Sequence, residues 1–144
     1  MNVILTGSDF LEIDDDAQSL ETLELLRKKT LGYFTIAFIG RMVEAKGIYI
    51  LTDALRKIHN LIPYRAFFIG DGIEKKNIEA QSQRAGLNIS FIGSQKNIKK
   101  YLMLADVVVV PSLQFEGLPM IILEAGVLKK AVIASNTNGI PEVI

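Results

Sequence analysis

The sequence predicts an α/β fold, a single domain with an open, doubly wound, Rossmann-like parallel sheet, from three observations. Short β-rich runs alternate with segments whose apolar residues recur at three- and four-residue spacing, as in amphipathic helices. The later runs, such as VVVV at 107–110, are almost wholly apolar, as strands are when helices cover both faces of a sheet. The chain has 144 residues, which suits one domain with a buried core.

The strands and helices follow one another as repeated units. The first strand, FTIAFI at 34–39, ends at Gly40, and Ile48, Leu51 and Leu55 share one face of the helix that follows. The same alternation predicts further strands at 65–69, 89–92, 107–110 and 131–134, and helices at 47–60, 74–85, 97–104, 119–128 and from Pro141 onward. Parallel strands joined by helical crossovers form a doubly wound sheet.

Two segments flank these units. Asp15 or Asp16 is expected to cap a helix that runs to about Lys28, with leucines every three residues on one side and basic residues in its last turn. At the other end, NGIPE has the composition of a turn that enters a helix, yet the sequence stops at Ile144. Three or four residues cannot form a stable helix, so we expect a domain that is truncated at its C-terminus.

The composition excludes several classes of function. The 16 Lys and Arg residues balance 16 Asp and Glu residues, so no net charge favours a nucleic acid partner. Without Cys the chain has no disulfide or thiolate chemistry, and with one His it has no multi-histidine metal site. No apolar run approaches the roughly 20 residues that span a bilayer, and no secretory signal is visible. A cytoplasmic protein with no transmembrane segment in this fragment fits these observations.

Loops rich in glycine and polar residues follow the strands, where ligands bind in doubly wound sheets. Each loop taken alone also fits ordinary turn chemistry. In GRMVEAKG at 40–47, Arg41 and Lys46 flank the entry to a helix and could converge on a diphosphate, with solvated loop cations as the alternative. The standard nucleoside triphosphate loop and the dinucleotide GxGxxG motif are both absent, which argues against nicotinamide chemistry.

The run EGLPMIILE at 116–124 is the most specific feature. Pro119 suits the first turn of a helix, so the N–H groups of residues 120–122 should point at the carboxyl edge of the sheet and form an anion site. Glu124 then lies about a turn and a half inside an apolar helix, tilted back toward its start. A carboxylate buried there needs a donor: a ribose diol would suit, while a cation or water would serve in a purely structural role.

Taken in order, GRMVEAKG, GDG, FIG, ADVVVVPS, EGLPMIILEA and NGIPEVI resemble the C-terminal, donor-binding domain of the group 1 (family 4 type) glycosyltransferases, retaining enzymes of the two-domain GT-B architecture. Glu116 and Glu124, with seven residues between them, match the family signature. The resemblance covers 34–144, and VILTGSD is more weakly similar to the segment that joins the two domains. It implies a linker-like segment with a leading helix at 1–30 and a partial nucleotide-sugar-binding domain at 31–144.

The resemblance implies a role for each matching position. Arg41 and Lys46 would hold the donor diphosphate, and Glu124 the ribose hydroxyls. Glu116 would hold a hydroxyl of the transferred sugar, and with the two cations it forms the implied catalytic set. The stretch at 91–93 would lie near the base. The full set of implied donor-binding residues is Gly40, Arg41, Lys46, Gly70, Gly72, Ile92, Glu116, Gly117, Leu118, Pro119 and Glu124.

The implied reaction transfers a hexose-type sugar from a nucleotide-diphosphate sugar to a glycan or lipid acceptor, with no required metal or other cofactor. Cations and a helix dipole would stabilise the departing diphosphate. The acceptor site would lie on an N-terminal domain absent from this fragment, so we expect donor binding without transfer. The implied setting is polysaccharide biosynthesis in the cytoplasm. Attachment of the enzyme to the inner membrane surface through the absent domain is left open.

The sequence departs from the family pattern at turns, and not at the two glutamates or the two cations. Lys129, Lys130 and Ala131 stand where GxP is usual before the last strand. Two alternatives stay open. One is a non-catalytic nucleotide-binding or assembly domain of the same fold, and the other is a sugar-nucleotide epimerase, against which the EGLPMIILE run argues.

Overall fold

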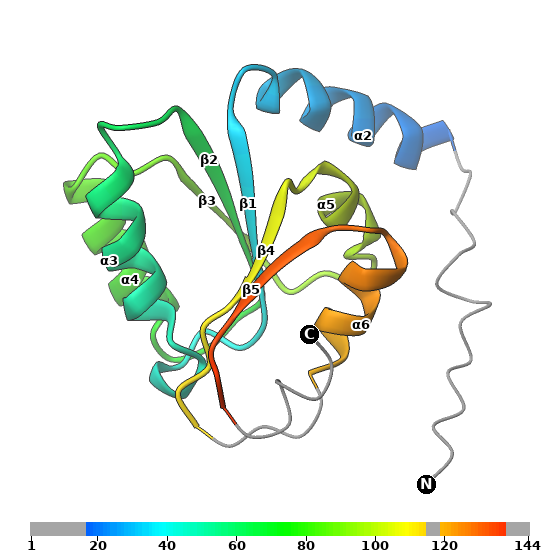
Figure 1. Ribbon diagram of the computed structural model, residues 1–144. Helices are drawn as coiled ribbons and strands as arrows, with labels where there is room; N and C mark the ends of the chain where they lie inside the picture. Colours follow the sequence, from blue (N-terminus) through cyan, green and yellow to red (C-terminus); the bar gives the residue numbers. More distant parts are fainter. Residues whose placement is uncertain (1–16, 115–118, 138–144) are drawn as a thin grey trace, which may run out of the picture.

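In the part of the chain that the structure describes, five parallel strands form one sheet in the order β3-β2-β1-β4-β5 (Figure 1). The computed structural model describes residues 17–114 and 119–137, with side chains from residue 21. The strands are β1 (Phe34–Ile39), β2 (Tyr64–Ile69), β3 (Ile89–Gly93), β4 (Val107–Val110) and β5 (Ala131–Ala134). The predicted α/β, doubly wound, single-domain fold is therefore confirmed.

Helices cover both faces of this sheet. On one face lie α3 (Ile48–Ile58) and α4 (Lys75–Arg84), and on the other lie α2 (Ala17–Thr30), α5 (Lys99–Leu104) and α6 (Met120–Val127), as Figure 1 shows. The alternation of side chains along β1 explains the two layers. Ile36 and Phe38 pack with the buried residues of α3, whereas Ala37 packs with those of α5 and α6.

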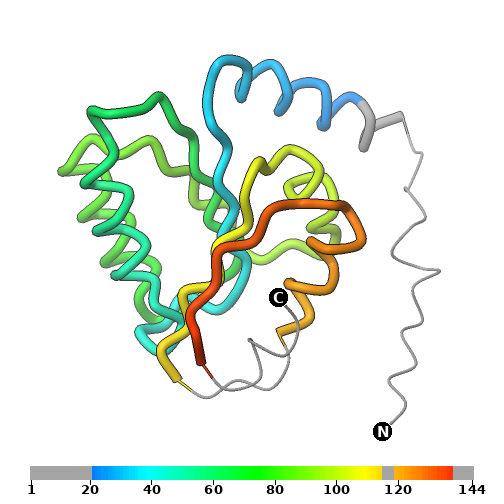
Figure 2. Tube along the Cα trace, viewed as in Figure 1, coloured from blue at the N-terminus to red at the C-terminus, as the bar shows by residue number. Residues whose placement is uncertain are grey.

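The central strands are buried and the edge strands are partly exposed. Figure 2 traces the chain from the early central strand β1 outward to β3 on one side, then back across to β4 and β5. In β5 every residue is exposed or half-buried, and Ile133 is 61% exposed. The apolar composition predicted that helices bury both faces of all the later strands. The strands β3 and β5 are instead partly exposed, because each pairs on one side only among the described residues.

A reciprocal contact joins the two halves of the sheet at the beginning of β1 and β4. The N–H of Thr35 donates to Oδ2 of Asp106 at 2.7 Å, and the N–H of Asp106 donates to the Thr35 carbonyl at 2.8 Å. The Asp106 carboxylate therefore accepts from the Thr35 N–H directly before the first paired residues of the two strands, Ile36 and Val107. This pairing fixes the register of β4 against β1.

The observed element ends agree with the predicted ones to within two residues, and the strands at 34–39, 107–110 and 131–134 match at both ends. Helix α2 continues to Thr30, whose hydroxyl donates to the Arg27 carbonyl at 3.0 Å, and Gly32 with φ +82° then turns the chain. A short 3-10 helix, η1 (Glu44–Lys46), precedes α3 and was not predicted. The proposed caps Asp15 and Asp16, and the helix from Pro141, lie outside the described residues.

Helix α6 ends in a Schellman motif with lysine at the position that normally holds glycine. The N–H of Lys130 donates to the Ala125 carbonyl, and that of Lys129 donates to the Gly126 carbonyl, both at 2.9 Å. Lys129 has φ +54°, which makes it the one non-glycine residue of positive φ in the described part of the chain. The departure from GxP noted in the sequence therefore places a strained backbone at this turn.

We predict that Lys129→Gly stabilises the protein by about 0.5–1 kcal/mol, because glycine adopts this conformation without the Cβ clash. Urea denaturation measures the change. The matched control is Lys130→Gly, which removes the 2.7 Å bond from Nζ to the Met103 carbonyl without relieving a positive φ, and should destabilise. A loss of stability in Lys129→Gly would contradict the strain.

Candidate functional site

The loops that follow β1, β2 and β4 meet at the carboxyl edge of the sheet. The N–H of Met42 donates to the Asp71 carbonyl at 2.8 Å, and the N–H of Glu74 donates back to the Met42 carbonyl at 3.0 Å. On the other side, the N–H of Leu113 donates to the Ala45 carbonyl at 2.9 Å. The loop after β1 is therefore held between its two neighbours by main-chain hydrogen bonds.

Three glycines allow these loops to pack backbone against backbone. A Cβ added to Gly70 would lie 2.0 Å from the Gly40 carbonyl oxygen, and one added to Gly72 would lie 2.3 Å from the Met42 carbonyl oxygen. A Cβ on Gly47, which has φ +67°, would lie 1.8 Å from the Pro111 carbonyl oxygen. The loop glycines were predicted to admit a positive φ or the close approach of a ligand, and here the close neighbour is another loop.

A cavity of about 180 Å³ lies beside these loops, where the strand order changes direction between β1 and β4. Its polar lining includes Lys46 from η1 and Ser112, a buried residue that follows β4. The complete lining is Phe38, Ile39, Lys46, Val109, Val110, Pro111, Ser112, Pro119, Met120 and Ile121. Ligands of doubly wound sheets bind at such a switch point, so this cavity is the candidate site.

Lys46 lines this cavity, and Arg41, which is not part of the lining, lies close enough for its charge to act on the Lys46 ammonium. Lys46 is half-buried and Arg41 is exposed. Burial, and then the charge of Arg41, hold the pKa of the Lys46 ammonium below its ordinary value. Two cations that repel each other at the mouth of a cavity favour an anion between them, since an anion would offset both effects.

Helix α6 begins at the cavity, with one correction to the predicted anion site. Pro119 is the N-cap residue rather than part of the first turn, and its carbonyl accepts from the N–H of Ile122 at 3.0 Å. That N–H is therefore engaged inside the helix. Met120 and Ile121, which precede it, both line the cavity and present the start of the helix to it.

Glu124 lies one turn further along α6 and is half-buried. Burial raises the pKa of its carboxyl group above the ordinary value. Among the described residues no side chain donates a hydrogen bond to this carboxylate or pairs with it. The structure thus holds an acid in a partly desolvated position that a polar ligand could stabilise.

The other predicted site residues lie in several places. Residues 91–93 end β3, which extends one residue past the predicted strand at 89–92; Phe91 packs on Phe68 at 5.3 Å between ring centroids, and Ile92 packs on the cluster that contains Tyr101. Gly40, Gly70 and Gly72 serve the loop packing described above. Glu116, Gly117 and Leu118 lie outside the described residues, and Glu124 and Arg41 do not line the cavity itself.

The sequence interpretation did not single out Ser112. The signal was present, because a small polar residue directly follows the buried strand β4 and Pro111. A hydroxyl at the carboxyl end of a central strand reaches the ligand edge of a parallel sheet. Its burial at 1% exposure, in the wall of the cavity, makes it a candidate contact.

The described ranges hold neither a cluster of metal ligands nor a helix suited to a bilayer. Within 17–114 and 119–137, no three His, Cys, Asp or Glu side chains gather as a metal site would require. Within the same ranges, no helix has the length and apolar character that crossing a bilayer needs.

The sequence profile of the family described as "Glycosyl transferases group 1" matches residues 24–144. This chain belongs to the group 1 glycosyltransferases. The UDP-Gal:alpha-D-GlcNAc-diphosphoundecaprenol alpha-1,3-galactosyltransferase of Escherichia coli is 34% identical over 125 residues, which cover 79% of this chain and 32% of that protein. The group 1 chain therefore spans about a third of the length of this curated relative.

Solved structures share the fold of this group 1 glycosyltransferase. Anabaena Alr3699/HepE in complex with UDP-glucose superposes with a TM-score of 0.76 at 26% identity, over 86% of this chain and 36% of that one. The C-terminal domain of the group 1 family protein LpcC from Francisella tularensis gives a TM-score of 0.67 at 27% identity, over 85% and 68%. The Rossmann-like architecture is thus that of known members of the family.

We predict that Gly47→Ala destabilises the protein by about 3 kcal/mol or more, because both a positive φ and a clash with Pro111 must be relieved. The control is Gly86→Ala, which shares a positive φ of +64° but has no atom within 4 Å of the added Cβ. That variant should lose only about 1 kcal/mol. Chemical denaturation gives both values, and equal losses would refute the packing argument.

We predict that Glu124→Gln raises the melting temperature by a few degrees at pH 7.5. The raised folded-state pKa means that the carboxyl contribution to stability is fully present below the unfolded pKa and is lost as the pH rises through the folded pKa. The gain in the variant should therefore shrink as the pH falls toward 5. Thermal unfolding across this range measures it, with Glu24→Gln on the exposed surface of α2 as the neutral control.

Proposed function

We propose that this chain is the donor-binding part of a retaining glycosyltransferase and that it holds a nucleotide-diphosphate sugar at the carboxyl edge of its sheet. The observation that carries the proposal is Lys46, half-buried in the switch-point cavity with Arg41 beside it and the start of α6 opposite. Fixed cations and a helix N-terminus are complementary to a diphosphate. The match to the group 1 family supports a glycosyltransferase over an epimerase.

The proposal gives Glu124 the ribose of the donor. A carboxylate accepts hydrogen bonds from both hydroxyls of a diol, and these would replace the hydration that Glu124 lacks in its half-buried position. Glu124 follows the start of α6 by about one turn, so a diphosphate at the helix start and a ribose beside the carboxylate belong to one ligand. Ser112 in the cavity wall adds a hydroxyl near the phosphate side.

The transferred sugar would be held by residues that the family signature supplies. Glu116 would accept from a sugar hydroxyl, and the backbone of Gly117 and Leu118 would line the phosphate and sugar. As the bond from the anomeric carbon to the diphosphate breaks, negative charge grows on the departing oxygen, and Arg41 and Lys46 would stabilise it. The acceptor oxygen would bond to the same face of the sugar, which gives retention. This scheme requires no metal.

We further propose that the donor is a UDP-hexose and that transfer needs a second domain. HepE was crystallised with UDP and with UDP-glucose, and the E. coli relative is named for UDP-Gal, which support uridine as the first base to test. The chain spans about a third of that relative, so the acceptor would bind to sequence outside it. The chain alone would bind the donor and would not transfer sugar.

The test is a calorimetric titration with UDP, GDP and ADP and their hexose conjugates. We expect one nucleotide to bind, and Glu124→Ala and Lys46→Ala each to weaken it about 10- to 100-fold, as expected for lost charged hydrogen bonds. Lys76→Ala, on the exposed surface of α4, removes the same charge and should have no effect. Affinity should also fall on acidification, because the raised pKa of Glu124 protonates this carboxylate at a higher pH than an ordinary Glu.

Two outcomes would overturn the proposal. Failure of the folded wild-type chain to bind any of the nucleotides would leave a non-catalytic assembly domain of the same fold. Binding that survives both Glu124→Ala and Lys46→Ala would place the nucleotide at a different site. Circular dichroism of each variant establishes that it is folded before the titration is interpreted.

A further inference from the structure

The amino edge of the sheet, opposite the candidate site, concentrates the basic residues of a chain with no net charge. Five connections reach this edge, at 27–34, 56–65, 84–89, 104–107 and 128–131, and they lie toward the top of Figure 1. Together they carry nine of the 16 Lys and Arg residues and one acid, Asp106. The nine are Arg27, Lys28, Lys29, Arg56, Lys57, Arg65, Arg84, Lys129 and Lys130.

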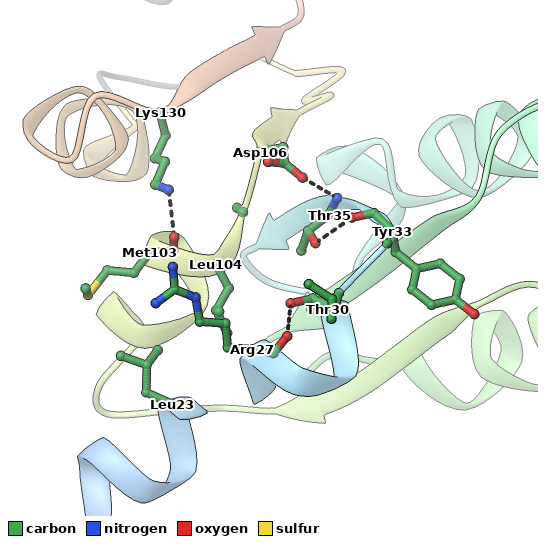
Figure 3. Close-up of a pocket in the computed structure, with 12 residues that line it drawn as sticks. Leu23, Arg27, Thr30, Tyr33, Thr35, Met103, Leu104, Asp106 and Lys130 are labelled. Atoms are coloured by element: carbon green, nitrogen blue, oxygen red, sulfur yellow. Dashed lines mark hydrogen bonds between the residues drawn. The ribbon is translucent and has the colours of Figure 1, made fainter. Parts of the chain in front are cut away.

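Of the nine cations, Arg56 pairs with Asp53 of α3 at 2.8 Å, and the acid within the connections, Asp106, is engaged inside the sheet. Asp106 accepts a hydrogen bond from the Thr35 N–H at 2.7 Å, within the junction of β1 and β4. Figure 3 shows this part of the edge, where Lys130 donates to the Met103 carbonyl at 2.7 Å and Arg27 lies nearby. A cavity of about 410 Å³ separates α2 from the ends of α5 and β1 here.

Large apolar side chains project from the same edge. Leu31 is 83% exposed and Leu61 is 76% exposed, although each occupies a tight connection where a polar residue would serve equally well. Three neighbours are also exposed: Tyr33, Phe34 and Ile62. Basic residues at helix ends complement the helix dipoles, which explains the cations but not the exposed leucines.

The two apolar connections are adjacent in space. The N–H of Phe34 donates to the Pro63 carbonyl at 2.9 Å, and Nη1 of Arg65 donates to the Lys29 carbonyl at 2.9 Å. The Arg65 guanidinium also lies 5.9 Å from the centroid of the Tyr33 ring. The exposed apolar residues of 31–34 and 61–62 therefore form one patch, which the basic residues surround. We call it the basic apolar edge.

We propose that the basic apolar edge binds the surface of an anionic lipid bilayer. Cations attract such a surface, while leucine and aromatic side chains at protruding turns enter the boundary between headgroups and acyl chains. An acidic protein would complement the charges, but its charged surface would not provide an apolar environment for the Leu31 and Leu61 side chains. These two side chains are more exposed than their apolar neighbours. The candidate nucleotide site lies on the opposite edge, so a bound membrane would leave it open.

Cosedimentation with vesicles tests this surface. With vesicles of about 30 mol% phosphatidylglycerol in phosphatidylcholine, the chain should bind at 50 mM salt, bind much less at 500 mM salt, and ignore pure phosphatidylcholine. Lys28→Gln with Lys29→Gln should lower the partition coefficient by about tenfold or more, since each basic residue near an anionic surface contributes roughly fivefold. The matched control is Lys76→Gln with Lys96→Gln, exposed on the opposite edge, which should bind like the wild type.

The apolar contribution has its own pair of variants. Leu31→Ser with Leu61→Ser should weaken vesicle binding about tenfold without changing the melting temperature, because both side chains are already exposed. Ile73→Ser, 86% exposed on the opposite edge, should leave binding unchanged. Three results would overturn the proposal: no binding to anionic vesicles, equal losses in the control variants, or full vesicle binding by the serine variant. Tight binding of soluble polyglutamate with no vesicle binding would point to an acidic protein instead.

Discussion

The close approach of main chains at the carboxyl edge is the constraint on which the candidate site depends. Carbonyl oxygens of Gly40, Met42 and Pro111 occupy the space where Gly70, Gly72 and Gly47 would carry a Cβ. Because three loops contact one another through backbone atoms, small side-chain changes nearby cannot shift one loop alone. Lys46 and the start of α6 both line the cavity, beside loops that these main-chain contacts hold together.

The charged groups of the site lower the stability of the fold that carries them. Lys46 is desolvated and repelled by Arg41, and Glu124 is desolvated with no partner among the described residues. Both costs are of the kind that a diphosphate and a diol would relieve, one by charge and the other by donation. The larger core cluster, around Phe68 and Leu55, includes one residue of the cavity lining, Phe38.

The sequence was sufficient to predict the order of elements, because the alternation of apolar runs and amphipathic segments can be read from spacing alone. The resemblance made Gly70 and Gly72 donor contacts, which stays a prediction, and the sequence did not reveal that each also packs against the backbone of another loop. Periodicity placed Ile92 in the third strand, as observed, but ended that strand one residue before Gly93, since a strand end depends on its neighbour in the sheet. Ser112 was not singled out, although its place directly after the buried strand β4 was a signal, because the cavity that it lines is formed by elements distant in the sequence.

The hydrogen bond between Thr35 and Asp106 joins residues 71 positions apart, whereas β1 and β2 pair across one helical crossover. The entropy of loop closure rises with the length of the closed segment and must be met before the contact is gained. The part containing β1, β2 and β3 is therefore the more local in sequence, and the pairing of β4 with β1 has the largest sequence separation among the described strand pairs. Such a difference in contact order makes the closing of β4 onto β1 the kinetically demanding step in folding.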